Sequence, residues 1–321
     1  LKNTYAKWGD WSAAWRAEGR GSNIDPGKAW SEMRDEGIEL ILQDEEAFPA
    51  PLREIHQCPW GLYYKGDLSA AGSPARAIVG SRKATSRGLT VAKNFARDLA
   101  AKGINIVSGL ALGIDASAHS GALEGGGRTA AILARGLDGV YPAQNENLAR
   151  KILANDGALI SEYPVKSPTL PFRFIERNRI TSGLSNATII IEAPSESGAL
   201  ATARFALEQN RDVGAIPGPI NHPNYTGNHS LIKSGAALIA SVDDIIAMLN
   251  LDQLPLKIKK SPILTEDELA IMNALKSEAG ALSVDKIIEL GRLEPQTTQR
   301  ALSLLLMKDI IRESDGRYEL N

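Results

Sequence analysis

Residues 77–107, AIVGSRKATSRGLTVAKNFARDLAAKGINIV, decide the fold of this chain. The apolar run Ala77-Ile78-Val79 predicts a buried strand, and the turn Gly80-Ser81-Arg82 ends it. Apolar residues then recur at helical spacing until Lys102-Gly103, a typical helix end. The run from Ile104 to Val107 predicts the next strand. Strands that alternate with helices indicate a parallel sheet with helices on both faces.

The same alternation continues after Val107, and two short strands precede it. Four further strands are predicted at Thr129 to Leu133, Ala158 to Ser161, Thr188 to Ile191 and Val213 to Ile216, and two short ones at Gly37 to Leu42 and Gly61 to Tyr64. We therefore predict one α/β domain over residues 37–250. Ligands of such sheets bind at the carboxyl ends of the strands.

Both flanks of this domain have a different character. Residues 1–36 place Trp8, Trp11 and Trp15 on one helical face, which predicts a small helical domain. The chain does not begin with Met, so we expect this domain to be truncated. Residues 251–261 predict a linker, and residues 262–321 predict three helices and a two-stranded ribbon, as in a winged helix.

Composition limits the classes of partner. The 321 residues carry a net charge of −2, and the pI near 6.2 argues against indiscriminate binding to nucleic acid. Residues 262–321 hold seven Lys and Arg against eleven Asp and Glu, which favours protein contact over duplex DNA for that unit. The single Cys58 excludes an internal disulfide, and no apolar run approaches the roughly 20 residues that span a bilayer. We expect a cytoplasmic protein.

One short segment concentrates positive charge and aromatic rings. Arg173, Arg177 and Arg179 stand beside Phe172 and Phe174. Guanidinium groups bind phosphate oxygens and aromatic rings stack on unpaired bases, so the segment favours a local nucleic-acid site. The alternative is that both rings are core residues and the arginines form surface ion pairs.

Three glycine or serine turns at strand ends could hold an anion. Gly80-Ser81-Arg82 follows the first central strand, Ser108-Gly109 follows the second, and Ser197-Gly198 stands where a helix begins. The first turn matches neither the dinucleotide fingerprint nor a Walker loop. A simple tight turn remains the alternative there.

Catalytic and metal sites have weak support. Asp115 and His119 lie four apart, but no further ligands stand at a recognisable spacing, so we expect His119 to bond Asp115 or the backbone. Glu192 and Glu196 are candidate acids, and we favour a capping or pairing role for Glu192. No nucleophile elbow or triad pattern occurs. The loop that contains Asn228 and Ser230 either caps a short helix or lines a pocket.

Six segments in order resemble the DNA-processing protein A (DprA/Smf) family over residues 37–245. They are Val79 to Arg82, Ser108 to Asp115 with His119, Gly136 to Asp138 with Tyr141-Pro142, Ser161 to Pro164, Arg177 to Ile180, and Ser197 to Ala203. The resemblance implies an α/β, extended Rossmann-like sheet between a sterile-alpha-motif-like helical domain and a winged-helix domain.

The resemblance also implies a function without catalysis, metal or cofactor. Members of the family bind single-stranded DNA during natural transformation, load the RecA recombinase and dimerise through the Rossmann-like domain. Site residues carried over are Gly80, Ser81, Arg82, Ser108, Gly109, Phe174, Arg177, Asn178, Arg179, Ser197 and Gly198. Lys166 and Arg173 are added from their position. Ile175 replaces the proline that the family usually has, which alters the aim of Phe174.

Two other functions stay open. A Rossmann-like nucleotide phosphoribohydrolase would use Glu192 or Glu196 as its acid, although the glycine signature of those enzymes is absent. A regulator that binds duplex DNA would act through residues 262–321.

Overall fold

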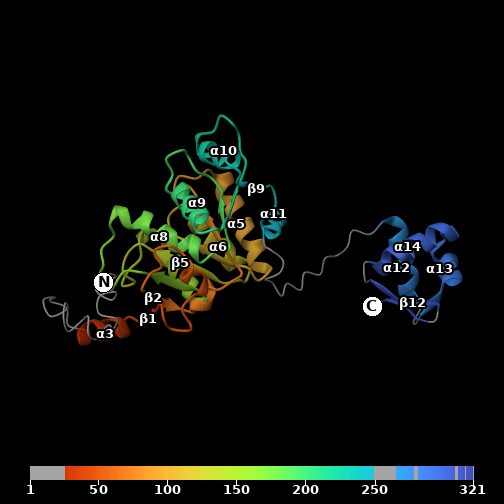
Figure 1. Cartoon of the computed structure of the whole chain (residues 1–321), viewed down its shortest axis with the longest axis horizontal. Coiled ribbons are helices and arrows are strands. Elements are labelled where there is room, and N and C mark those ends of the chain that lie inside the picture. The colour runs from red at the N-terminus through yellow and green to blue at the C-terminus, as the bar shows by residue number, and fades with distance from the viewer. Residues whose placement is uncertain (1–25, 249–264, 278–280, 308–309, 315, 321) are drawn as a thin grey trace. The chain divides into compact units, whose positions relative to one another are not determined.

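The computed structural model describes residues 26–248, 265–277, 281–307, 310–314 and 316–320 (Figure 1). The predicted tryptophan helix at Trp8 to Trp15 and the predicted linker at 251–261 lie outside the described residues. The chain divides into two compact units, Leu1–Leu254 and Pro255–Asn321. Among the described helices, none is long and apolar enough to cross a membrane.

The first unit alternates strands and helices, as its sequence predicts. Its first half contains α3 (Pro26–Asp35), β1 (Glu39–Leu42), α4 (Ala50–Arg53), β2 (Gly61–Gly66), η2 (Leu68–Ala71), β3 (Ala75–Val79), α5 (Ser86–Ala101), β4 (Asn105–Ser108), α6 (Ile114–Glu124) and β5 (Thr129–Leu133). Its second half contains η3 (Ala143–Asn145), α7 (Glu146–Ala154), β6 (Ala158–Ser161), α8 (Pro171–Gly183), β7 (Ala187–Ile190), α9 (Gly198–Glu208), β8 (Asp212–Ala215), η4 (Pro223–Tyr225), α10 (Thr226–Lys233), β9 (Ala237–Leu238) and α11 (Val242–Ala247).

Within the described residues the sheet has nine strands in the order β1-β2-β6-β5-β4-β3-β7-β8-β9. The strands from β6 to β9 in this order run parallel, which confirms a Rossmann-like α/β fold. The predicted parallel arrangement does not extend to one edge, where β1 and β2 form an antiparallel pair and β2 joins β6 antiparallel. The physical reason is burial. Central strands such as β3 are buried on both faces, whereas β1 is partly exposed, and antiparallel strands tolerate that exposure.

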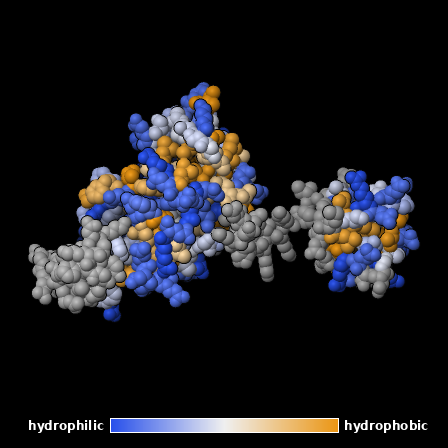
Figure 2. Space-filling view, in the orientation of Figure 1, coloured by the Kyte–Doolittle hydropathy of each residue, from blue (hydrophilic) through white to orange (hydrophobic). Residues whose placement is uncertain are grey.

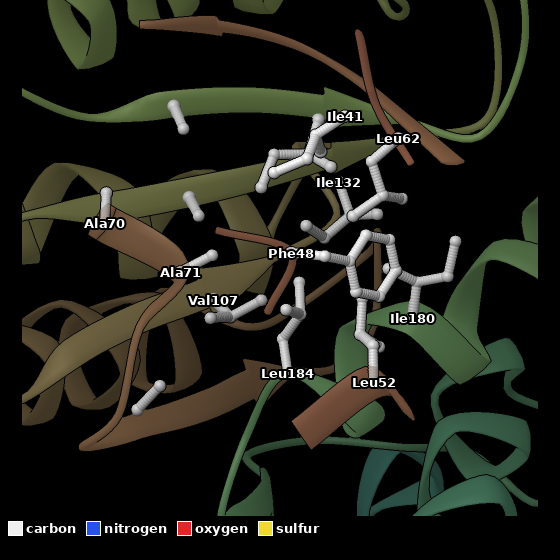
Figure 3. Close-up of a cluster of buried hydrophobic side chains, with 14 of the residues drawn as sticks. Ile41, Phe48, Leu52, Leu62, Ala70, Ala71, Val107, Ile132, Ile180 and Leu184 are labelled. Carbon is white, nitrogen blue, oxygen red and sulfur yellow. The ribbon is translucent and has the colours of Figure 1, made fainter. Parts of the chain in front are cut away.

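Helices cover both faces of the sheet. On one face Ile132 and Ile160 of the sheet pack against Ile180 of α8 and Leu52 of α4, as Figure 3 shows for part of this cluster. Alternate residues of the same strands point to the other face, where they pack against Ile152 of α7 and its neighbours. The core therefore holds α8 against one face of the sheet.

The order of the strands reverses between β3 and β7. From β3 the chain continues to β4 on one side, and from β7 it continues to β8 on the opposite side. Two neighbouring strands whose connections leave in opposite directions open a crevice at their carboxyl ends. The loops that contain Gly80 and Ser197 meet at this edge, as the sequence predicts.

The second unit is described by itself. It contains α12 (Glu266–Ser277), β10 (Leu282–Ser283), α13 (Val284–Gly291), α14 (Pro295–Met307), β11 (Ile311–Ser314) and β12 (Arg317–Leu320). The predicted ribbon is β11 and β12, and β10 adds a third strand beside β12. Ile271, Ile287, Leu302 and Leu305 are buried in its core, so the apolar residues of the third helix serve packing.

Candidate functional site

A cavity of about 710 Å³ opens at the crevice between β3 and β7. Its walls come from α8, from the start of α9 and from the loops after β3, β4, β5, β7 and β8. Nine of the predicted site residues line it: Gly80, Ser81, Arg82, Gly109, Phe174, Arg177, Asn178, Ser197 and Gly198. Segments more than 100 residues apart in the sequence thus meet at one edge.

The rim of the cavity consists of Arg82, Lys83, Tyr141 and Phe174. The guanidinium carbon of Arg82 lies 4.8 Å from the centroid of the Phe174 ring. The ring of Tyr141 lies 5.6 Å from that of Phe174, tilted by 52°. Arg82 and Lys83 are exposed, so both cations can meet a ligand that approaches from solvent. The rim therefore combines two positive charges with two aromatic faces.

The floor of the cavity consists of Gly109, Asp115 and Arg177. Nη1 of Arg177 donates to the carbonyl oxygens of Gly109 and Ile132, and only 5% of the Arg177 side chain is exposed. The Asp115 carboxylate accepts the N–H of Gly109 at 3.1 Å. A Cβ atom at Gly109 would overlap the guanidinium group, so a larger residue there would displace Arg177.

Burial dominates the protonation equilibria of the floor. It lowers the pKa of Arg177 to about 10, although the Asp115 charge opposes the shift. Burial also raises the pKa of Asp115, and the charge of Arg177 opposes that shift. Arg177 stays protonated at neutral pH, and its positive charge and the Asp115 carboxylate attract each other across the floor.

The floor corrects the prediction that Ser108 and Gly109 donate to a ligand. Oγ of Ser108 donates to the carbonyl oxygen of Ile78 at 2.7 Å, and the N–H of Gly109 donates to Asp115. Ser108 is fully buried and lies outside the cavity lining. The physical reason is that buried donors are mostly satisfied inside the fold, and Ile78 and Asp115 supply the acceptors for these two.

Three further predicted residues lie away from the cavity. Arg179 is buried, and its Nη2 binds both carboxylate oxygens of Glu162 at 2.7 Å. Residues two apart on a helix point to different sides, so Arg177 and Arg179 cannot line one pocket. Arg173 lies over the ring of Tyr163, with 4.3 Å to the centroid. Lys166 forms an ion pair with Glu32 at 2.7 Å. Of the four predicted arginines, Arg82 therefore lies at the rim, Arg177 lies in the floor, and Arg173 and Arg179 lie outside the cavity lining.

Glu192 has the structural role that the sequence favours. Its carboxylate is buried and accepts from the N–H and Oγ1 of Thr85, from Nδ2 of Asn224 and from the hydroxyl of Tyr225 at 2.5 to 3.0 Å. Burial raises the pKa of Glu192, but these hydrogen bonds outweigh burial and hold the pKa below its ordinary value. The carboxylate therefore stays ionised and ties the loop after β7 to the start of α5.

His119 is a buried neutral residue. Its Nδ1 lies 2.7 Å from Oγ1 of Thr129, whose hydroxyl donates to the carbonyl oxygen of Ile106. The imidazole therefore donates from Nδ1. The partner is Thr129, not Asp115 or the backbone as the sequence analysis expects. Burial and the charge of Arg177 lower the pKa of His119 to about 3. Among the described residues, no group of three metal-ligating side chains occurs.

The sequence leaves open whether the loop with Asn228 caps a short helix or lines a pocket, and the structure shows the role of the Asn228 side chain. Asn228 is fully buried and its Nδ2 donates to three carbonyl oxygens, those of Ile190, Ile191 and Ile216. It neither caps a helix with its side chain nor lines the cavity. It holds the carboxyl ends of β7 and β8 together instead.

Two rim residues were missed by the sequence analysis. Lys83 follows Arg82 directly in the sequence, so a second cation beside the glycine turn could have been recognised there. Tyr141 lies in a segment quoted for the family resemblance, but the sequence gives no sign that its ring lies near Phe174.

Comparisons with known proteins agree with this geometry. The family model for DNA recombination-mediator protein A matches residues 39–250. Protein Smf from Escherichia coli is 41% identical over 224 residues, which cover 70% of this chain and 59% of that protein. The chain thus spans less than two thirds of that relative.

Two solved structures resemble the chain. The X-ray structure of DNA processing protein A from Streptococcus pneumoniae has a TM-score of 0.63 at 37% identity and covers 70% of this chain and 78% of that one. The second is DNA processing protein A from Helicobacter pylori, a structure described for its single-stranded DNA binding mode. It has a TM-score of 0.60 at 30% identity and covers 67% of this chain and 96% of that one.

Proposed function

Since the chain belongs to the DNA recombination-mediator protein A family, we propose that it binds single-stranded DNA at the cavity between β3 and β7. In this role it protects incoming DNA during natural transformation and promotes the loading of RecA. The observation that carries the proposal is the rim, where an exposed guanidinium lies over an aromatic ring at the mouth of a cavity.

The rim and the floor have different roles in binding. Arg82 and Lys83 contact phosphate groups, since both cations are exposed beside the mouth. Phe174 stacks on a base, which contributes about 1–3 kcal/mol per base. The floor contacts no phosphate directly. Arg177 and Asp115 each bond the backbone of Gly109, so the walls keep their shape when a strand enters.

The remaining predicted residues act as walls or supports. Gly80, Ser81, Asn178, Ser197 and Gly198 line the cavity beside the rim. Nδ2 of Asn178 donates to the carbonyl oxygen of Gly198, which joins α8 to the start of α9. Arg179 supports the site only through Glu162.

We infer no catalytic activity. The phosphoribohydrolase alternative needs a carboxyl group that exchanges protons with a substrate, whereas four donors already engage Glu192. Release of a base from a nucleoside monophosphate, abolished by Glu192→Gln, would revive that alternative.

The assembly and the flanking domains belong to the same proposal. A homodimer through the Rossmann-like unit would bring two cavities to one strand and raise affinity through avidity. The three helices and three strands of residues 265–320 are consistent with a winged helix, and the acidic balance of that unit favours a protein partner. We place the protein in the cytoplasm with RecA, and residues 1–36 as a sterile-alpha-motif-like domain.

The test compares oligonucleotide affinity in the wild type and in Arg82→Ala. The wild type binds single strands more tightly than duplexes. Arg82→Ala lowers the affinity about tenfold or more and reduces the salt slope by about 0.7, the value for one phosphate contact on a single strand. Arg150→Ala removes an exposed arginine of α7 as a matched control. Equal affinity and slope in Arg82→Ala and the control would overturn the site.

A further inference from the structure

The first turn of α8 carries two separate arginine–aromatic clusters. One is the rim of the cavity, which takes Phe174 from α8. The other, here called the outer cluster, consists of Tyr163, Phe172 and Arg173. The two clusters share no residue, and Phe172 and Phe174 point to different sides of the helix because they are two residues apart.

The outer cluster is held in a defined geometry. The guanidinium carbon of Arg173 lies 4.3 Å from the centroid of Tyr163 and 6.0 Å from that of Phe172. Nη1 of Arg173 donates to the carbonyl oxygen of Pro168 at 2.6 Å. The hydroxyl of Tyr163 donates to Glu176 at 3.0 Å. The carbonyl group of Pro168 and the ring of Tyr163 thus orient Arg173. Both are uncharged, so they do not neutralise its guanidinium group.

Phe172 presents its ring to solvent. Its side chain is 56% exposed, and Ile175 on the same helix is 45% exposed. Figure 2 shows hydrophobic residues on the surface over this part of the first unit. Single exposed apolar residues are ordinary on protein surfaces. Phe172 differs because it lies beside an oriented guanidinium group and one residue away from the segment that lines the cavity.

We propose that the outer cluster is a second nucleotide-binding station, at which a base of the same DNA strand stacks on Phe172 while Arg173 contacts its phosphate. The proposal rests on the proposed function. The strand leaves the cavity at Phe174 and crosses the first turn of α8. A helix with its side chains is about 10–12 Å wide, a distance that a few nucleotides span.

The charges around the outer cluster determine how strongly salt affects DNA binding there. Glu162 is neutralised by Arg179, while Glu176 accepts from Tyr163 and sets one negative charge against Arg173. The net positive charge is therefore smaller than at the rim, where Arg82 and Lys83 are both exposed. Stacking contributes more than charge at this station, so its loss lowers affinity by a factor that hardly depends on salt.

The experiment measures the affinity of oligothymidylates from about 4 to about 16 nucleotides by fluorescence anisotropy. Phe172→Ala binds the shortest strands as the wild type does and binds the longest about tenfold more weakly at every salt concentration. Phe172→Trp keeps a stacking surface and restores the affinity for long strands. Leu207→Ala removes an apolar side chain of matched exposure, 57%, and has no effect.

Three outcomes would overturn the second station. Phe172→Ala binds long strands like the wild type while Phe174→Ala is weak, which leaves the proposed function intact. In the second, Phe172→Ala lowers the affinity for strands of every length by the same factor, which makes Phe172 part of the cavity. Finally, a wild type that binds no oligonucleotide removes the proposed function together with the station.

Discussion

The rim and the floor of the cavity each contain an arginine, but the two differ in burial and in partners. Arg82 is exposed and lies against an aromatic ring. Arg177 is buried, lies near the charge of Asp115 and is hydrogen-bonded to two backbone carbonyl groups. The comparison teaches that positive charge near a site does not itself identify a ligand contact. Exposure decides whether a guanidinium can meet a ligand from solvent or supports the fold.

The largest expected effect is on stability, at the floor. Arg177→Met removes two buried hydrogen bonds and the positive charge that offsets the burial of Asp115, and each carbonyl group left without a donor costs about 1–3 kcal/mol. Urea unfolding of the variant measures the loss. Arg150→Ala, which breaks an exposed pair with Glu146, costs less than about 1 kcal/mol. A loss as small as that of Arg150→Ala would show that Arg177 does not support the fold.

The next effect is a pH dependence caused by His119, which lies close to the floor. Its pKa is about 3 in the folded protein and about 6.5 in the unfolded chain, so the unfolded chain binds the proton first. Stability therefore falls as the pH drops from about 6.5 towards 3, by about 2 kcal/mol at pH 5.

The measurement is the unfolding free energy against pH for the wild type, for His119→Asn and for a control, His56→Gln, at an exposed histidine. His119→Asn loses this slope between pH 6.5 and 5, and His56→Gln keeps it. An unchanged slope in His119→Asn would contradict burial of a neutral imidazole.

At the rim the expected effect is on binding and not on stability. Phe174→Ala removes a stacking face and weakens single-stranded DNA binding about tenfold, without a change in the salt slope. Unfolding measurements show a change below about 1 kcal/mol, because the ring is only partly buried. A variant that unfolds readily but still binds would make Phe174 a core residue, the alternative left open by its sequence.

The smallest expected effect on binding concerns Arg179. Its guanidinium is engaged by both oxygens of Glu162, so Arg179→Ala leaves the salt slope of DNA binding unchanged. Titration of the oligonucleotide complex with salt checks this. A decrease in slope similar to that of Arg82→Ala would mean that Arg179 exchanges Glu162 for phosphate when DNA binds.

Much of the fold could be predicted because its signals are local. Runs such as Ala77 to Val79 are buried on both faces, and glycine turns end them, so strand and helix positions follow from the sequence. The antiparallel edge formed by β1 and β2 could not, because its pairing with β6 joins segments about 100 residues apart.

The site was predicted less completely for a related reason. Sequence spacing brings Gly80, Ser197 and α8 to one edge, but the use of each polar group depends on long-range contacts. Ser108 and Gly109 are donors whose partners appear only in the fold. The divergence of Arg177 and Arg179 was foreseeable, because residues two apart on a helix do not share a face.

The central claim is that a single DNA strand enters the cavity at its rim, and photo-crosslinking tests it most directly. An oligonucleotide that carries a photoreactive uracil is irradiated with the protein, and mass spectrometry locates the attached residue. The account predicts attachment at Phe174 or Tyr141, and its loss in Arg82→Ala. Attachment confined to residues 265–320, with none on the rim, would contradict it.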